Sequence, residues 1–212
     1  MPALTLMIIR HGEKPGGAWP GPGLTIDGTP DARSLVVRGW QRAGAWAALF
    51  GAGLGGADFP PPGVIHAANP SAGAGAVAAD NGPSQRPFQT VKPLADRLGL
   101  QPVMTWGLGQ EADLAAEIKG LSGVVLVCWE HKRIISGILP AITGGAALPA
   151  LPLKWDGPRF DVVLRFDRAA PGAAWSFRQL FPKLLSGDSV IPLGKGKTID
   201  GEAATGHGKP ET

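Results

Sequence analysis

The sequence predicts an α/β fold, a three-layer sandwich in which a mostly parallel central sheet lies between helices on both faces. Two observations support this prediction. Short, uninterrupted apolar runs recur along the chain, as is typical of strands buried on both faces. Segments with apolar residues at helical spacing separate these runs, and such an alternation implies right-handed crossovers between parallel strands.

Three apolar runs are the expected parallel strands: residues 4–9 (LTLMII), 64–66 and 124–128. A further strand is expected over residues 160–166 (FDVVLRF). The first run is only six residues long before Arg10, which is too short for the core of a secretory signal. We therefore interpret it as the first strand.

Helical periodicity marks the segments between the strands. Residues 38–50 and 110–121 each place their large apolar side chains along one helix face. A closing helix is expected over residues 175–185, interrupted near Pro182.

Glycine and proline are abundant, with 32 Gly and 21 Pro in 212 residues, which predicts long loops. We expect these loops at residues 15–31, 51–63 and 71–83. The chain length fits a single domain, which we place at residues 1–193. Residues 194–212 have little apolar content and are expected to form a flexible tail.

Composition excludes several classes of function. The formal charge of +3 is small and scattered, which argues against a nucleic-acid groove. No apolar stretch reaches the roughly 18 residues of a transmembrane helix. The lone Cys128 cannot form an intramolecular disulfide and fits a reducing compartment, so we expect a cytoplasmic protein. The sequence leaves the oligomeric state open.

Chemistry-bearing residues follow two of the predicted strands. The first strand ends in Arg10 and His11, and the strand over residues 124–128 leads into Glu130 and His131. Ligands of open α/β sheets bind at the carboxyl ends of the strands. If these strands are neighbours, the two imidazoles face each other across one crevice.

A second arginine is expected at the start of a helix. Ser84 fits an N-cap, and Pro87 is tolerated in a first turn, so Arg86 falls where the helix dipole is positive. Pro93 is expected to kink or divide this helix. Two arginines, two histidines and a helix N-terminus together predict a site for a phosphate dianion, either inorganic or on a small substrate.

A histidine in such a site predicts phosphoryl transfer. A neutral imidazole held by a backbone hydrogen bond on one nitrogen is a usable nucleophile through the other, which favours His11 in this role. The leaving group also needs a proton from a carboxylic acid with a raised pKa. Glu111, at the start of its helix, is the candidate, and Asp113 is the reserve.

The motifs LMIIRHGEKP, GWQRAGAWAALF, SQRPFQTVKPLADRLGL and VVLVCWEH together resemble the histidine phosphatase superfamily, also called phosphoglycerate mutase-like. Within this superfamily, the chain resembles the small bacterial phosphatase members, and the resemblance spans a little over half of the chain. It implies that His11 is phosphorylated without a cofactor, and that Arg10, Arg86 and His131 form the phosphate pocket. It also implies that Glu111, 25 residues after Arg86, is the proton donor.

The sequence departs from the family pattern in two places. A Gly/Ala-rich insertion at residues 71–83 separates the strand of His66 from Arg86, and Glu130 replaces the small residue often found before the second histidine. The insertion puts the shape of one pocket wall in doubt. Glu130 either orients a neighbouring base or faces solvent.

Four functions remain open from the sequence. The leading one is a cofactor-independent phosphomonoesterase, and the second is a phosphomutase of the same mechanism. A third is a catalytically silent phosphate-binding module on this fold. A metal hydrolase using His11, His131, Glu130 and Cys128 is the fourth, although Glu130 and Cys128 flank Trp129 in one strand and would not easily converge.

Overall fold

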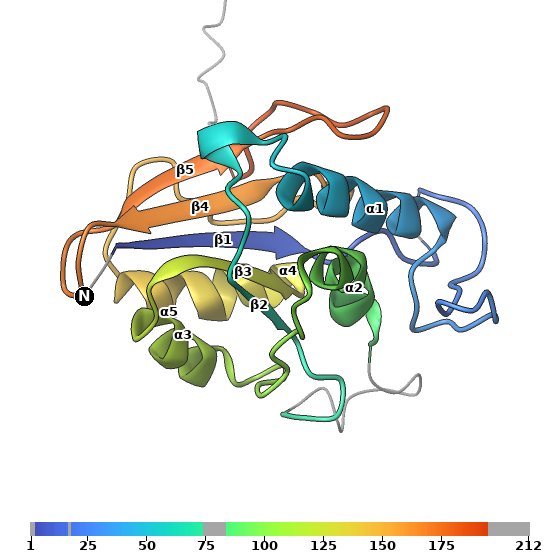
Figure 1. The fold of residues 1–212 in the computed structure, drawn as a ribbon, viewed down its shortest axis with the longest axis horizontal. Helices are drawn as coiled ribbons and strands as arrows, with labels where there is room; N and C mark the ends of the chain where they lie inside the picture. The colour runs from blue at the N-terminus through green and yellow to red at the C-terminus, as the bar shows by residue number, and fades with distance from the viewer. Residues whose placement is uncertain (1–2, 17, 74–83, 195–212) are drawn as a thin grey trace, which may run out of the picture.

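The computed structural model describes most of the chain, namely residues 3–16, 18–73 and 84–194. Its strands form one sheet in the order β2-β3-β1-β4-β5 (Figure 1). Strands β1 (Leu4–Arg10), β2 (Val64–Ala67) and β3 (Gly123–Trp129) are parallel. Strand β4 (Val163–Arg168) pairs antiparallel with β1, and β5 (Ser176–Leu180) pairs antiparallel with β4. The three predicted parallel strands are confirmed, and β4 and β5 extend the sheet beside β1.

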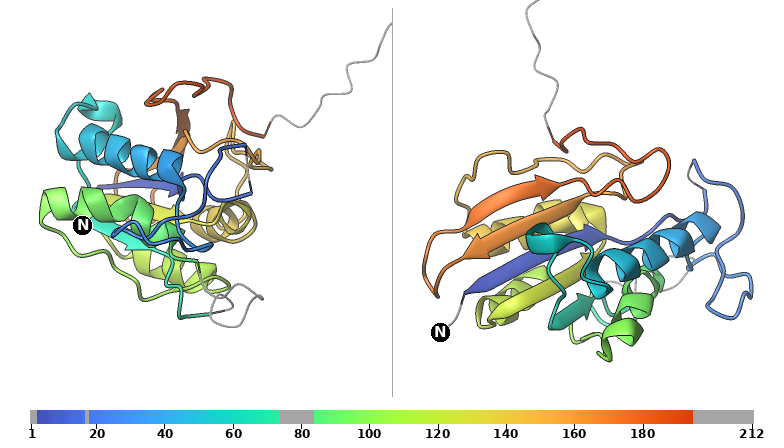
Figure 2. Two further views of the ribbon diagram at one scale, coloured as in Figure 1. Left: turned by 90° about the vertical axis from the view of Figure 1, so that its right-hand side faces the viewer. Right: turned by 45° about the horizontal axis from the view of Figure 1, so that its top comes forward.

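Helices cover both faces of the sheet, as Figure 2 shows end-on. One face carries α1 (Val37–Gly51) and α2 (Arg86–Leu98), which pack against each other. The other face carries α3 (Glu111–Lys119) and a continuous helical run over residues 131–143. This arrangement confirms the predicted α/β sandwich.

The helical run that follows β3 changes its winding along its length. It begins as α4 (His131–Arg133), continues as the π-helical η3 (Ile134–Ile138) and ends as α5 (Leu139–Thr143). Pro140 lies just beyond the π-helical turn and has no N–H to donate. Because the run begins directly after β3, it starts at the end of the sheet where the candidate site lies.

The core lies on both faces of the sheet because strand side chains alternate in direction. In β1, Leu6 and Ile8 belong to the cluster beneath α3, whereas Met7 and Ile9 belong to the cluster beneath α1 and α2. All four side chains are fully buried. This double burial explains why β1 reads as an unbroken apolar run.

The predicted closing helix over residues 175–185 is wrong, because β5 occupies this segment. Phe177 lies opposite Phe166 of β4, with ring centroids 4.8 Å apart. Cross-strand aromatic pairs of this kind stabilise a sheet. The predicted strand over residues 160–166 exists as β4, but it begins three residues later and runs antiparallel to β1.

Helix α2 also differs from the prediction. It continues through Pro93 without a break, and its flanking residues Val91 and Leu94 are buried in the core, which offsets the hydrogen bond that proline cannot make. Its N-cap position is Gln85, whose side chain makes no capping bond, while the hydroxyl of the preceding Ser84 accepts from the N–H of Arg86 at 3.5 Å.

The predicted loops and tail are described only in part. Residues 51–63 contain the short 3-10 helix η1 (Gly56–Asp58). Residues 74–83, most of the predicted insertion, lie outside the described residues, as does the tail after Gly194. The domain boundary after residue 193 therefore stays a prediction. Among the described residues, no helix combines the length and apolar character needed to cross a membrane.

Candidate active site

The two predicted histidines meet at one edge of the sheet because β1 and β3 are adjacent and parallel. Arg10, the last residue of β1, pairs with Trp129, the last residue of β3. The backbone N–H of His11 then donates to the carbonyl of Trp129 at 3.1 Å. His131 begins the helix that follows β3. The predicted convergence of the two strands is confirmed.

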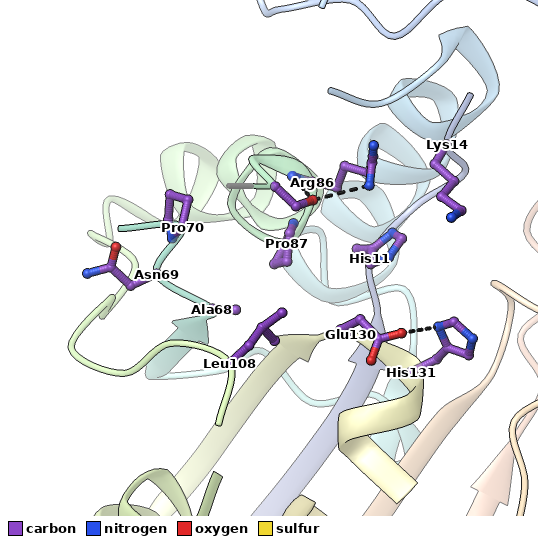
Figure 3. Close-up of a pocket in the computed structure, with 11 residues that line it drawn as sticks. His11, Lys14, Ala68, Asn69, Pro70, Arg86, Pro87, Leu108, Glu130 and His131 are labelled. Carbon is purple, nitrogen blue, oxygen red and sulfur yellow. Dashed lines mark hydrogen bonds and ion pairs between the residues drawn. The ribbon is translucent and has the colours of Figure 1, made fainter. Parts of the chain in front are cut away.

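A pocket lies at this edge and contains His11, Arg86 and His131 in its wall (Figure 3). Lys14 and Glu130 are its other ionisable residues. The remaining wall is formed by Ala68, Asn69, Pro70, Ser84, Pro87 and Leu108. The pocket therefore combines two basic side chains, two histidines and one carboxylate with a largely apolar wall.

His11 is held as a neutral imidazole. Its Nδ1 lies 2.7 Å from the carbonyl oxygen of Gly12, which can only accept a hydrogen bond, so Nδ1 carries the hydrogen and Nε2 has a free lone pair. Burial and then the positive charge of Arg10 lower the pKa of His11 to about 3, against a weaker opposite effect of the Gly12 hydrogen bond. Near neutral pH, His11 is thus unprotonated at Nε2, the state that a nucleophile requires.

The turn that carries His11 is fastened to α1 and α2. The N–H of Gly12 donates to Thr90 Oγ1 at 2.8 Å, and this hydroxyl donates to the carbonyl of Arg86 at 2.7 Å. A Cβ at position 12 would lie only 3.0 Å from the carbonyl oxygen of Gly39, so the close approach to α1 favours glycine. Arg86 and Thr90 are one helical turn apart, and the hydrogen bonds between Thr90, Arg86 and Gly12 therefore help to position His11.

Arg86 is the first residue of α2, as predicted, and its guanidinium is oriented by the loop that precedes α1. Its Nη2 donates to the carbonyl of Ala32 at 2.6 Å and its Nε to the carbonyl of Ser34 at 3.3 Å. Nη1 lies 3.3 Å from Ser84 Oγ. Burial lowers the pKa of Arg86, and nearby Asp31 opposes this shift. The arginine is thus fixed at the pocket wall next to the helix N-terminus.

Arg10 does not line this pocket, in contrast to the expectation that four residues surround one oxyanion. Its guanidinium donates to the carbonyls of Gly157 at 2.6 Å and Arg159 at 3.1 Å, and its Cζ lies 3.8 Å from the centre of the Phe160 ring. It lines an adjoining pocket, and Lys14 lines both. The positive charge of Arg10 nevertheless lowers the pKa of His11.

The expectation that Glu111 is the proton donor is not supported by its position. The side chain is buried outside the pocket wall, where its carboxylate accepts hydrogen bonds from Trp129 Nε1 at 3.0 Å and from the N–H of Gly109. A Cβ on Gly137 would contact it, so a neighbouring helix packs directly on its stem. Glu111 thus links α3 to β3 through its contact with Trp129.

Glu130 is a pocket residue for which the sequence left two roles open, to orient a neighbouring base or to face solvent. Its Oε1 lies 2.7 Å from His131 Nδ1, and its Oε2 accepts from the N–H of Arg133 at 2.9 Å, which caps α4 (Figure 3). Burial opposes ionisation, but the contacts with His131 and with the N–H groups of Arg133 and Lys132 outweigh it and lower the pKa of Glu130 to about 2. The carboxylate is therefore ionised and bound to His131.

A buried ion cluster that the sequence analysis missed supports the turn after His11. Arg42 of α1 donates to both oxygens of Glu13, with the shortest contact at 2.8 Å, and to Asp188 at 2.8 Å. Glu13 and Arg42 are almost fully buried. The only signal in the sequence was Arg42, a charged residue on the inner side of the helix predicted over residues 38–50.

Other residues noted in the sequence lie away from the pocket. Cys128 is fully buried in the core, where burial raises its pKa, and His66 is buried in β2. Trp129 is buried against Glu111. In the part of the chain that the structure describes, no three His, Cys, Asp or Glu side chains gather as metal ligands would.

Comparison with known proteins adds little. No protein-family model matches the chain, and no curated protein matches it. Among solved structures, a mycobacterial glucosyl-3-phosphoglycerate phosphatase is similar at 15% identity and a TM-score of 0.46, over 84% of this chain and 98% of that one. Mycobacterial hydrolase 2 is similar at 17% identity and a TM-score of 0.41, over 84% and 90%. The function must therefore be inferred from the pocket itself.

Proposed function

We propose that this protein is a phosphomonoesterase that hydrolyses small phosphorylated compounds through a phosphohistidine on His11 and uses no cofactor. The observation that carries the proposal is the state of His11: a neutral, buried imidazole whose unprotonated Nε2 shares a pocket with Arg86 and Lys14. A neutral nucleophile beside fixed cations is suited to attack on a phosphate dianion.

The reaction has two steps. In the first, His11 Nε2 attacks phosphorus, a P–N bond forms, and the P–O bond to the leaving group breaks. In the second, water attacks the phosphohistidine, the P–N bond breaks, and inorganic phosphate leaves. Arg86 and Lys14 would stabilise the charge on the transferring group, where catalysis depends mainly on position and electrostatics.

The resemblance to the histidine phosphatase superfamily supports the same proposal. The Arg-His-Gly string lies at the end of β1, and Arg86 and His131 share the pocket with His11. The carboxylate that the resemblance implies, Glu111, is replaced in our proposal by a donor inside the pocket. The apolar part of the wall, including Pro70 and Leu108, would contact the organic part of the substrate.

The experiment that tests the proposal is turnover of a generic aryl phosphate, together with trapping of the phosphoenzyme at low temperature. We expect wild-type protein to release phosphate and to carry an acid-labile, base-stable phosphoryl group. His11→Ala should lose both, because removal of a nucleophile costs several powers of ten in rate. The control is His66→Gln, a change of a buried histidine outside the pocket wall, which should keep both signals.

Two results would favour the other functions. Transfer from a bisphosphate primer to product with little net phosphate release would identify a phosphomutase. Phosphate binding without turnover by wild-type protein would identify a silent binding module. Turnover by His11→Ala at the wild-type rate would refute the proposed mechanism outright.

A further inference from the structure

Phosphomonoester hydrolysis needs a proton at the leaving oxygen, and the pocket restricts where that proton comes from. Glu111, the carboxylic acid that the sequence pointed to, is buried beside Trp129 and does not line the pocket. Among the described residues of the pocket wall, Glu130 is the one carboxylate. The donor is therefore to be found among Glu130 and the groups around it.

Glu130 itself is unsuited to hold the proton. Its carboxylate contacts His131 at 2.7 Å and accepts from the N–H of Arg133 at 2.9 Å, and its pKa is about 2. A general acid works best when its pKa lies near the working pH, so that it is protonated and still acidic. An ionised carboxylate with two such contacts acts instead as an acceptor that orients its neighbour.

His131 is the neighbour that Glu130 orients. The carboxylate lies 2.7 Å from Nδ1, which leaves Nε2 as the other ring nitrogen of a residue that lines the pocket (Figure 3). Its position at the start of α4, directly after β3, places the ring at the same sheet edge as His11. A carboxylate behind a histidine selects its tautomer and supports its charged form during proton transfer. Histidine is also the side chain that most readily gains and loses a proton near neutral pH.

We propose that His131, oriented by Glu130, is the general acid and then the general base of the reaction. This inference rests on the proposed phosphohistidine mechanism. In the first step, the imidazolium of His131 gives its Nε2 proton to the leaving oxygen as the P–O bond breaks, and becomes neutral. In the second step, neutral Nε2 takes a proton from the attacking water as the P–N bond breaks. The imidazolium is restored, and the proton balance closes over one turnover.

The test compares two substrates in two variants, Glu130→Gln and His131→Asn. An aryl phosphate such as 4-nitrophenyl phosphate has a leaving group that departs without a proton, whereas an alkyl phosphate such as glycerol 2-phosphate needs one. General acid catalysis contributes about 10²- to 10⁴-fold. We expect kcat/KM for the alkyl ester to fall by about that factor in His131→Asn, and by a smaller factor in Glu130→Gln. The fall for the aryl ester should be at least tenfold smaller in each variant.

Glu130→Gln keeps an oxygen that can accept from the N–H of Arg133, so the helix cap survives while the negative charge is lost.

A double variant and a control make the comparison specific. The double variant should be no worse than His131→Asn alone, because residues that act as one unit are not additive. Lys132→Gln, a neighbour that does not line the pocket, is the matched control and should leave both rates unchanged.

The outcomes separate this inference from the mechanism beneath it. An equal loss on both esters in His131→Asn would reduce His131 to a phosphate ligand and overturn the inference while the phosphohistidine is still trapped. A selective loss on the alkyl ester in Glu130→Gln but not in His131→Asn would make Glu130 the donor, which also overturns it. Absence of turnover and of trapped phosphohistidine in wild-type protein would instead remove the proposed function and this inference with it.

Discussion

Replacement of Thr90 by valine tests how the turn of His11 is held in place. Thr90 is fully buried, and its hydroxyl accepts from the N–H of Gly12 at 2.8 Å and donates to the carbonyl of Arg86 at 2.7 Å. Valine has nearly the same shape but no hydroxyl, so Thr90→Val leaves a buried N–H without its acceptor. The cost of such an unpaired group is about 1–3 kcal/mol. The free energy of unfolding should fall by that amount.

The same change should lower the rate, because the carbonyl of Gly12 fixes Nδ1 of His11. A displacement of about 1 Å at a reacting group costs on the order of 100-fold in rate. Thr90→Ser is the matched control: it keeps the hydroxyl and removes one methyl group, which costs roughly 0.8 kcal/mol of burial. We expect Thr90→Ser to be slightly less stable than wild type but to keep its kcat.

The measurements are urea unfolding followed by tryptophan fluorescence and kcat with an aryl phosphate. Equal kcat values in Thr90→Val and Thr90→Ser would refute the idea that this hydrogen bond positions His11. Equal unfolding free energies of Thr90→Val and wild type would refute the assigned energy of the bond.

Three other predictions concern stability and pH. Arg42→Met removes the guanidinium that pairs with the buried carboxylates of Glu13 and Asp188, and should lower the unfolding free energy by about 3–5 kcal/mol in urea titrations; wild-type stability would contradict the assigned cluster. Glu111→Ala should cost about 1–3 kcal/mol of stability but leave the aryl-to-alkyl rate ratio unchanged, whereas a selective loss on alkyl phosphates would restore it as proton donor. Because the folded pKa of His11, about 3, lies below its ordinary value of 6.5, the unfolded chain binds the extra proton between these values. Wild-type stability should therefore decline as pH falls from about 6.5 to 4, and His11→Gln should decline less over that range; equal slopes would argue against a neutral His11.

The parallel half of the fold could be predicted from the sequence because its signals are local. A strand buried on both faces must be apolar at every position, and β1 and β3 show this pattern directly. The helices α1 and α3 follow from apolar residues at helical spacing. Once two parallel strands are neighbours, the residues that follow them share one edge. The meeting of His11 and His131 therefore follows from local patterns and one topological rule.

Contacts between segments distant in the chain determined the parts of the fold and of the site that the sequence did not predict. The segment of β5 is a strand because Phe177 packs on Phe166 across the sheet, and a short run with two aromatic residues does not reveal this partner by itself. The spacing along the chain predicted Glu111 as the proton donor, but its carboxylate accepts a hydrogen bond from the buried Nε1–H of Trp129. A charged group follows its hydrogen-bond partners, which sequence spacing alone does not specify.

The amino-acid sequence by itself determined which strands deliver histidines to the sheet edge, because burial periodicity is written into consecutive residues. Only the tertiary structure decided where the charged side chains around them point. Arg10 turns toward the carbonyl of Gly157, 147 residues further along the chain, while Glu111 turns toward Trp129 of β3. The physical reason is that a long polar side chain has many rotamers of similar energy, and buried partners from other segments select among them.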